Sequence, residues 1–200
     1  MRLAEALKPR VQPPATVLAI PRGGVVIAEP VADALGAPLD VVIPRKLGAP
    51  GNPELAIGAV APGVLVVHER AVRQLGVPEA YLRREAERQE AEIGRREVAY
   101  RGGREPAPVA ERTVAIVDDG VATGATAVAA LRWARAADAS RVIFAAPVGP
   151  PAARARLEPE SDEVVILEEP RGFMAVGEWY FDFEQVSDDE VVELLRRAQT

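Results

Sequence analysis

Two consecutive acidic residues, Asp118 and Asp119, follow an apolar run and precede a stretch rich in glycine and threonine. The stretch reads Gly120, Val121, Ala122, Thr123, Gly124, Ala125 and Thr126. A helical pattern follows it, and backbone N–H groups at the start of a helix bind phosphate well. The acids need hydroxyl groups or a metal ion as partners. The stretch contains neither G-x-x-x-x-G-K-[ST] nor G-x-G-x-x-G, which argues against a P-loop and a dinucleotide fingerprint.

Two further groups of polar residues follow apolar runs. Arg22, Gly23 and Gly24 come after the first run, and Arg45 and Lys46 come after the second. Ligands of a parallel sheet bind outside the carboxyl ends of its strands. If the runs are parallel strands, these cations and the acid pair lie along one edge of the sheet.

Composition narrows the class of protein. A chain of 200 residues fits one domain, and it has no cysteine, which excludes disulfides and thiolate metal sites. His68 is the one histidine, and no serine stands in G-x-S-x-G, which argues against a serine hydrolase. The net charge is −6, whereas proteins that bind nucleic acids usually carry an excess of basic residues, so we expect no nucleic-acid partner. The high arginine and proline content is typical of a thermophile or a GC-rich genome.

No run of about 18 apolar residues occurs, and the N-terminus lacks the apolar segment of a signal peptide. We therefore expect a soluble cytoplasmic protein without a membrane partner.

The chain alternates strand-like and helix-like segments, which predicts an α/β fold with a central, mostly parallel five-stranded sheet flanked by helices. The expected strands are residues 16–20, 39–43, 113–117, 141–146 and 163–167. The expected helices are residues 25–35, 125–137 and 187–198, with Ser187 and Glu190 forming a capping box.

Two segments depart from this alternation. Residues 69–111 form a charged, mostly helical insertion with a narrow apolar stripe, which predicts an exposed helix. Five of the nine aromatic residues fall within residues 173–183, which predicts a small hood. We therefore divide the chain into a core of residues 1–168, which includes the helical insertion, and a C-terminal part of residues 169–200, which comprises the hood subdomain and the last helix.

Residues 114–126, from Val114 to Thr126, resemble the phosphoribosyl-diphosphate (PRPP) motif of type I phosphoribosyltransferases. The resemblance implies that Asp118 and Asp119 bind the ribose hydroxyls and that the following loop, Gly120 to Thr126, binds the 5′-phosphate. It also implies transfer of the phosphoribosyl group from PRPP to a nitrogenous acceptor, with release of pyrophosphate. Mg²⁺ is then the cofactor, held mainly through PRPP, and homodimers are common in the family.

Other segments extend the resemblance. Arg22, Gly23 and Gly24 look like the pyrophosphate loop, and Arg45 and Lys46 look like the basic pair of orotate-type members. Residues 48–58 stand where the family has a mobile catalytic loop, and residues 173–183 where it has a hood over the base. Arg22 and Lys46 are the groups expected to offset charge on the departing pyrophosphate.

The sequence departs from the family pattern at two loop positions. Gly120 replaces an apolar residue, and Ala122 replaces the acid that acts as base in hypoxanthine- and guanine-using members. The acceptor is therefore not identified.

Two alternatives remain: a non-catalytic module that binds PRPP or a nucleotide, and a receiver-like domain. A receiver-like domain would need an acidic cluster after the first strand, and this sequence lacks one there. The basic residues Arg22, Arg45 and Lys46 favour the enzyme over the non-catalytic module.

Overall fold

The protein is built around a parallel sheet of five strands. The computed structural model describes residues 2–198, without the side chain of Glu54. The strands run in the order β2-β1-β6-β7-β8. They are β1 (Ala15–Ala19), β2 (Leu39–Val41), β6 (Thr113–Val117), β7 (Arg141–Val148) and β8 (Glu163–Glu168). The predicted five-stranded parallel sheet is confirmed, and each expected strand lies within three residues of its predicted ends.

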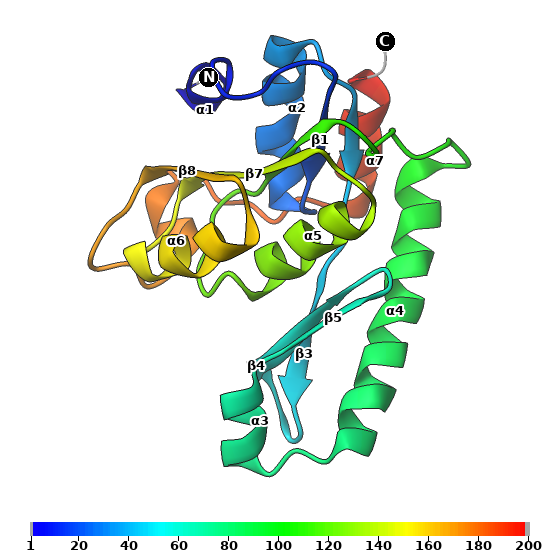
Figure 1. The fold of residues 1–200 in the computed structure, drawn as a ribbon, viewed down its shortest axis with the longest axis vertical. Helices are drawn as coiled ribbons and strands as arrows, with labels where there is room; N and C mark the ends of the chain where they lie inside the picture. The colour runs from blue at the N-terminus through cyan, green and yellow to red at the C-terminus, as the bar shows by residue number, and fades with distance from the viewer. Residues whose placement is uncertain (1, 199–200) are drawn as a thin grey trace.

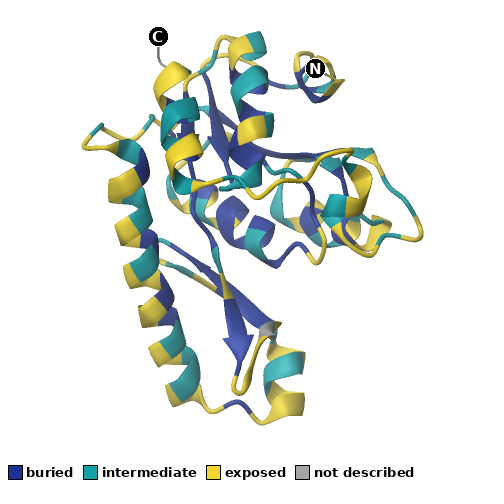
Figure 2. Cartoon of the chain, turned by 180° about the vertical axis from the view of Figure 1, so that it is seen from behind, coloured by how far each residue is buried: buried dark blue, intermediate teal, exposed yellow. Residues whose placement is uncertain are grey.

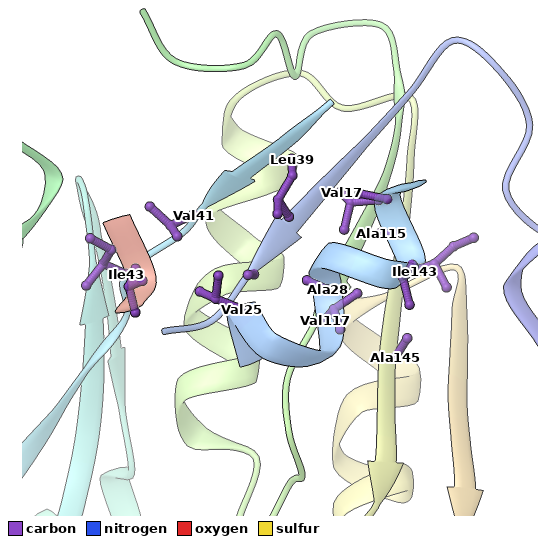
Figure 3. Packing of buried hydrophobic residues seen from close by; sticks show 14 of the residues in the cluster. Val17, Val25, Ala28, Leu39, Val41, Ile43, Ala115, Val117, Ile143 and Ala145 are labelled. Carbon is purple, nitrogen blue, oxygen red and sulfur yellow. The ribbon is translucent and has the colours of Figure 1, made fainter. Parts of the chain in front are cut away.

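Helices cover both faces of this sheet (Figure 1). They are α1 (Arg2–Leu7), α2 (Gly23–Leu35), α5 (Ala125–Ala136), α6 (Pro151–Leu157) and α7 (Asp188–Arg197), with a short 3-10 turn η1 (Glu158–Glu160) after α6. Val17 and Ile143 pack with α1, α2 and α7, and Figure 3 shows this layer around Val25. Leu18 and Phe144 point the other way, toward α5 and α6. Successive strand residues thus serve two separate cores, as alternation requires.

A second, smaller sheet follows β2. It is antiparallel and comprises β3 (Arg45–Ala49), β4 (Asn52–Ala61) and β5 (Val64–Val67). Residues 48–58, expected to form a loop, therefore lie in a β-hairpin. At Gly48 the strands come so close that a Cβ atom would lie 2.6 Å from Cα of Pro53. The segment needs small residues for this approach, and those residues hide the usual strand pattern.

The charged insertion consists of α3 (Glu69–Leu75) and α4 (Glu79–Arg101). Helix α4 buries Ala86, Ile93 and Tyr100 against the core and exposes its other faces (Figure 2). Its last residue, Arg101, is 3.1 Å from an oxygen of the buried Asp40 carboxylate in β2. The predicted exposed helix with a narrow apolar stripe is confirmed, and it ends at Arg101 rather than near residue 111.

The chain after β8 runs as an irregular segment with one short 3-10 turn, η2 (Val176–Trp179), before α7. Ser187 and Glu190 form the predicted capping box at the start of α7. The division at residue 168 stays a prediction. Within the described residues, no helix is both long enough and apolar enough to cross a membrane.

Candidate functional site

The sheet changes direction of winding at β1. After β1 the chain adds β2 on one side of this strand, and it later adds β6 on the other side. A crevice at the carboxyl ends of the strands is expected at such a point. The loops after β1 and β6 are the two that border it, and they carry Arg22, Gly23 and Gly24 on one side and Asp118 and Asp119 on the other.

The two loops pack directly against each other at Gly23 and Gly24. A Cβ atom on Gly23 would lie 1.8 Å from Oδ2 of Asp119, and one on Gly24 would lie 2.8 Å from the carbonyl oxygen of Val117. Real Cβ contacts essentially never fall below 3.0 Å. Only glycine therefore fits at both positions without displacing the acid loop, and the structure brings the predicted acid pair and glycine pair together.

The acid pair lies in a poorly solvated place. Burial and then the nearby Asp119 charge hold the pKa of Asp118 well above its usual range, and burial raises the pKa of Asp119. The backbone N–H of Asp119 donates to Oδ1 of Asp118 at 2.9 Å. A carboxylate has about four lone-pair sites, so both side chains can accept hydrogen bonds from a ligand's hydroxyl groups.

The loop after the acids leads into α5. Gly124 stands at the helix start with φ of 76°, and no side chain caps the first turn. Ala122 and Thr123 are exposed, while Val121 is buried and donates its backbone N–H to the Val148 carbonyl at 2.9 Å. The loop is thus anchored at Val121 and exposes Ala122 and Thr123. Uncapped N–H groups at a helix start suit an anion.

Arg156 of α6 supports this loop and was not predicted from the sequence. Its Nη1 donates to the Thr123 carbonyl at 3.2 Å, and its Nη2 contacts Nε2 of His68. Burial and the Arg156 charge lower the pKa of His68. Arg156 lies 33 residues beyond Thr123 with no motif of its own, so no local pattern could have identified it.

Arg22 lies close to an acidic residue of α7. The Pro21–Arg22 peptide bond is cis. Nη1 of Arg22 lies 3.7 Å from Oδ1 of Asp188 in α7, and the hydroxyl of Tyr100 in α4 donates to the same oxygen at 2.6 Å. Tyr100 is fully buried, and burial together with this carboxylate raises its pKa to about 12. Asp188 of α7 thus links Arg22 to Tyr100 of α4.

The structure separates Arg45 from Lys46. Arg45 pairs in register with Val60 and Lys46 with Ala59, and these two partners belong to different cores. Arg45 lies on the side of α4, where its Nε donates to the side-chain oxygen of Gln89 at 2.8 Å, and burial lowers its pKa. Lys46 is exposed, and its register partner Ala59 belongs to the core on the side of α5. Strand alternation directs the two side chains to opposite faces, although both residues line one pocket together with Gln89 of α4.

The segment after β8 closes over the acid loop. The hydroxyl of Tyr180 donates to the backbone carbonyl of Asp119 at 2.5 Å, and burial raises the pKa of Tyr180. A Cβ atom on Gly120 would lie 2.6 Å from Cγ1 of Val176. The unusual glycine at position 120 therefore makes room for Val176.

A pocket of about 250 Å³ lies between this segment and the start of α2. Its lining residues are Arg22, Gly23, Val26, Ile27, Asp119, Tyr180, Asp182, Phe183, Glu184, Gln185 and Val186. The rings of Tyr180 and Phe183 stand 5.3 Å apart in this wall. No three acidic or histidine side chains of residues 2–198 are grouped closely enough to hold a metal ion by themselves.

Similarity to known proteins agrees with this geometry. Two curated Mycobacterium tuberculosis proteins, from strains CDC 1551 and H37Rv and provisionally named phosphoribosyl transferases, are each 48% identical over 183 residues. The match covers 91% of this chain and 41% of each relative, so the chain spans about two fifths of their length.

A crystal structure of the protein TT1426 from Thermus thermophilus is 47% identical and superposes with a TM-score of 0.82, covering 98% of this chain and 93% of that one. The sequence model of the phosphoribosyl transferase domain matches residues 3–188. The chain therefore belongs to the phosphoribosyl transferase domain family.

Proposed function

We propose that the protein transfers the phosphoribosyl group of PRPP to a nitrogenous acceptor and releases pyrophosphate. The observation that carries this proposal is the contact between the glycine pair and the acid pair at the point where the sheet reverses its winding. A ribose held by Asp118 and Asp119 would bring its C1 carbon and diphosphate next to Gly23 and Gly24.

Each group of the site has a task in this reaction. The carboxylates accept hydrogen bonds from the ribose hydroxyls, and the loop from Gly120 to Thr126 with the first turn of α5 binds the 5′-phosphate. Arg22 and the backbone of Gly23 and Gly24 bind the diphosphate. Lys46 approaches from the small sheet to offset the charge that develops on the leaving group.

The bond changes balance without a redox partner. A nitrogen lone pair of the acceptor forms the new C–N bond at C1, and the C1–O bond breaks with its electron pair going to the diphosphate. The proton on the attacking nitrogen passes to water, since Ala122 offers no base in the loop. The transition state is oxocarbenium-like, as in glycoside cleavage, so the protein positions the reactants and excludes water.

The donor set fits magnesium. Two carboxylates beside a diphosphate provide the oxygen ligands that Mg²⁺ takes in such sites. When bound through PRPP, the ion supplies positive charge at the leaving group. Asp118 and Asp119 are the residues that would contribute protein oxygens to it.

Titration calorimetry of the protein with PRPP and Mg²⁺, followed by measurement of pyrophosphate release with a panel of bases, tests the proposal. Binding with release in the presence of one base supports the transferase. Binding without release from any base identifies instead a regulatory module that senses PRPP. Absence of binding contradicts both.

A further inference from the structure

The pocket beside Asp119 is the place left for the acceptor, given the proposed function, on which this inference rests. Its wall includes Asp119 and Gly23, the residues on which the ribose and the diphosphate would lie. Substitution at one carbon requires the incoming group to reach the same atom that the leaving group departs from. A pocket that borders both subsites meets this requirement.

The shape of the pocket suits a flat ring. Tyr180 and Phe183 form one side, with ring centres 5.3 Å apart and planes inclined at 44°, and Val26 and Ile27 of α2 belong to the same lining. The Tyr180 ring is fixed, because its hydroxyl donates to the Asp119 carbonyl. A planar heteroaromatic ring buries both of its faces against such walls.

The charges of the pocket are unequal. Its lining includes three acidic residues, Asp119, Asp182 and Glu184, and one basic residue, Arg22. Arg22 already faces the carboxylate of Asp188 at 3.7 Å. Ionised carboxylates accept hydrogen bonds and donate none. The part of the pocket formed by Asp182 and Glu184 therefore favours a ligand that donates hydrogen bonds, and it repels one that carries negative charge.

We propose that the acceptor is an amino-substituted heteroaromatic base, whose exocyclic amino group donates to Asp182 or Glu184. Bases that present carbonyl oxygens at that position leave the carboxylates without donors, and bases that carry a carboxylate are repelled. Asp182 and Glu184 are thus specificity-determining residues of this site.

Base binding tests the proposal apart from turnover. Adenine and hypoxanthine differ by an amino group against an oxo group at nearly equal size, as do cytosine and uracil, and orotate carries a carboxylate. Each is titrated by calorimetry into the protein with Mg²⁺ and pyrophosphate, which fills the place of the leaving group and allows no transfer. We expect the amino member of at least one pair to bind about tenfold or more tightly than its oxo partner, and orotate not to bind.

The double variant Asp182→Asn with Glu184→Gln should remove this preference while PRPP affinity stays within about twofold. Glu178→Gln is the matched control, because Glu178 is an exposed acid of the same segment that does not line the pocket. Equal or tighter binding of the oxo or carboxylated bases overturns the proposal, as does a preference that the double variant retains.

Pyrophosphate release, measured on the same panel with PRPP, tests the transferase function separately. Selective binding of amino bases without release rejects the transferase and keeps the assigned ligand class. Release with hypoxanthine or orotate as the best acceptor supports the transferase and rejects the assigned ligand class.

Discussion

At the scale of single residues, the site depends on a missing side chain. Gly23 lets the loop after β1 lie directly against the Asp119 carboxylate, and any Cβ atom would enter the space of that group. The carboxylate is the more mobile partner, because Gly23 is the first residue of α2 and its backbone is held by that helix. A substitution here should consequently move the acid rather than unfold the loop.

We expect Gly23→Ala to weaken PRPP binding by about ten- to a hundredfold, which corresponds to roughly 1.4–2.8 kcal/mol. The physical reason is displacement of Asp119 from the position where it meets the ribose. Calorimetry gives the affinity, and thermal unfolding shows whether the fold survives. Gly172→Ala is the matched control, since no atom lies within 4 Å of its Cβ position. Unchanged affinity in Gly23→Ala would show that the ligand does not use this acid.

Asp119→Asn keeps the shape of the side chain and removes its charge. A hydrogen bond to a charged group contributes roughly 1.5–3 kcal/mol, so PRPP affinity should fall by about ten- to 150-fold. The fold should remain intact, because the amide has nearly the same size and shape as the carboxylate. Full retention of affinity by calorimetry would remove the acid pair from the site.

The sequence predicts these residues because they are close together in it. The acids and the loop after them form one continuous motif, and the glycine pair follows the first strand directly. Tyr180, Asp188 and Arg156 complete the site from elsewhere. The contact from Tyr180 to Asp119 spans 61 positions in the chain, so only the folded structure reveals it.

At the scale of elements, the strand β3 sets the orientation of the two basic residues Arg45 and Lys46. Adjacent residues of a strand point to opposite faces, so we expect Arg45 and Lys46 to contribute differently to the site. The sequence suggests a pair because Arg45 and Lys46 are neighbours. The hairpin escapes prediction because Gly48, Gly58 and the alanines of β4 lack the β-branched side chains that identify the main sheet.

Lys46→Ala should lower kcat more than it raises KM for PRPP, because the proposed contact strengthens as pyrophosphate leaves. Arg45→Ala should change neither by more than about twofold, since Arg45 contacts Gln89 on the other face. Steady-state kinetics with the acceptor identified by the base panel provide the comparison. Equal losses in the two variants would contradict the assignment of faces.

Helix α7 contributes through Asp188, which lies between Arg22 and Tyr100. Without this carboxylate, Arg22 is expected to turn toward the acid pair and to lower the pKa values there. Because the Arg22 contact is partly exposed and 3.7 Å long, its loss should cost at most about 1 kcal/mol, or up to about fivefold in PRPP affinity.

Asp188→Asn should therefore weaken PRPP binding up to about fivefold and move its pH dependence toward lower pH. Tyr100→Phe is the control, because it removes only the hydroxyl and leaves the carboxylate beside Arg22. A pH dependence of binding that is identical in Asp188→Asn and the unchanged protein would show that Asp188 has only a structural role.

At the scale of the whole molecule, the buried acid that the site needs lowers the stability of the folded chain. Burial keeps the pKa of Asp118 raised in the folded chain, so at pH values between the ordinary and the raised pKa the folded state holds a proton that the unfolded state has released. The free energy of unfolding should accordingly fall as the pH rises from the ordinary value for aspartate, about 3.9, through the raised value. Above that window the destabilisation is complete and constant.

Asp118→Asn removes the charge and should raise the midpoint of thermal unfolding at pH 7 and above. In a domain of this size, each kcal/mol recovered corresponds to about 2–4 °C. The gain should shrink strongly near pH 3.5, just below the ordinary aspartate pKa of about 3.9, because most unfolded chains then also carry the proton. The variant should also bind PRPP more weakly, as expected where a binding site keeps charges that stability disfavours. Unfolding curves at pH 3.5, 5 and 7 measure the effect, and a variant that is equally stable or less stable at pH 7 would show that Asp118 carries no such desolvation cost in the free protein.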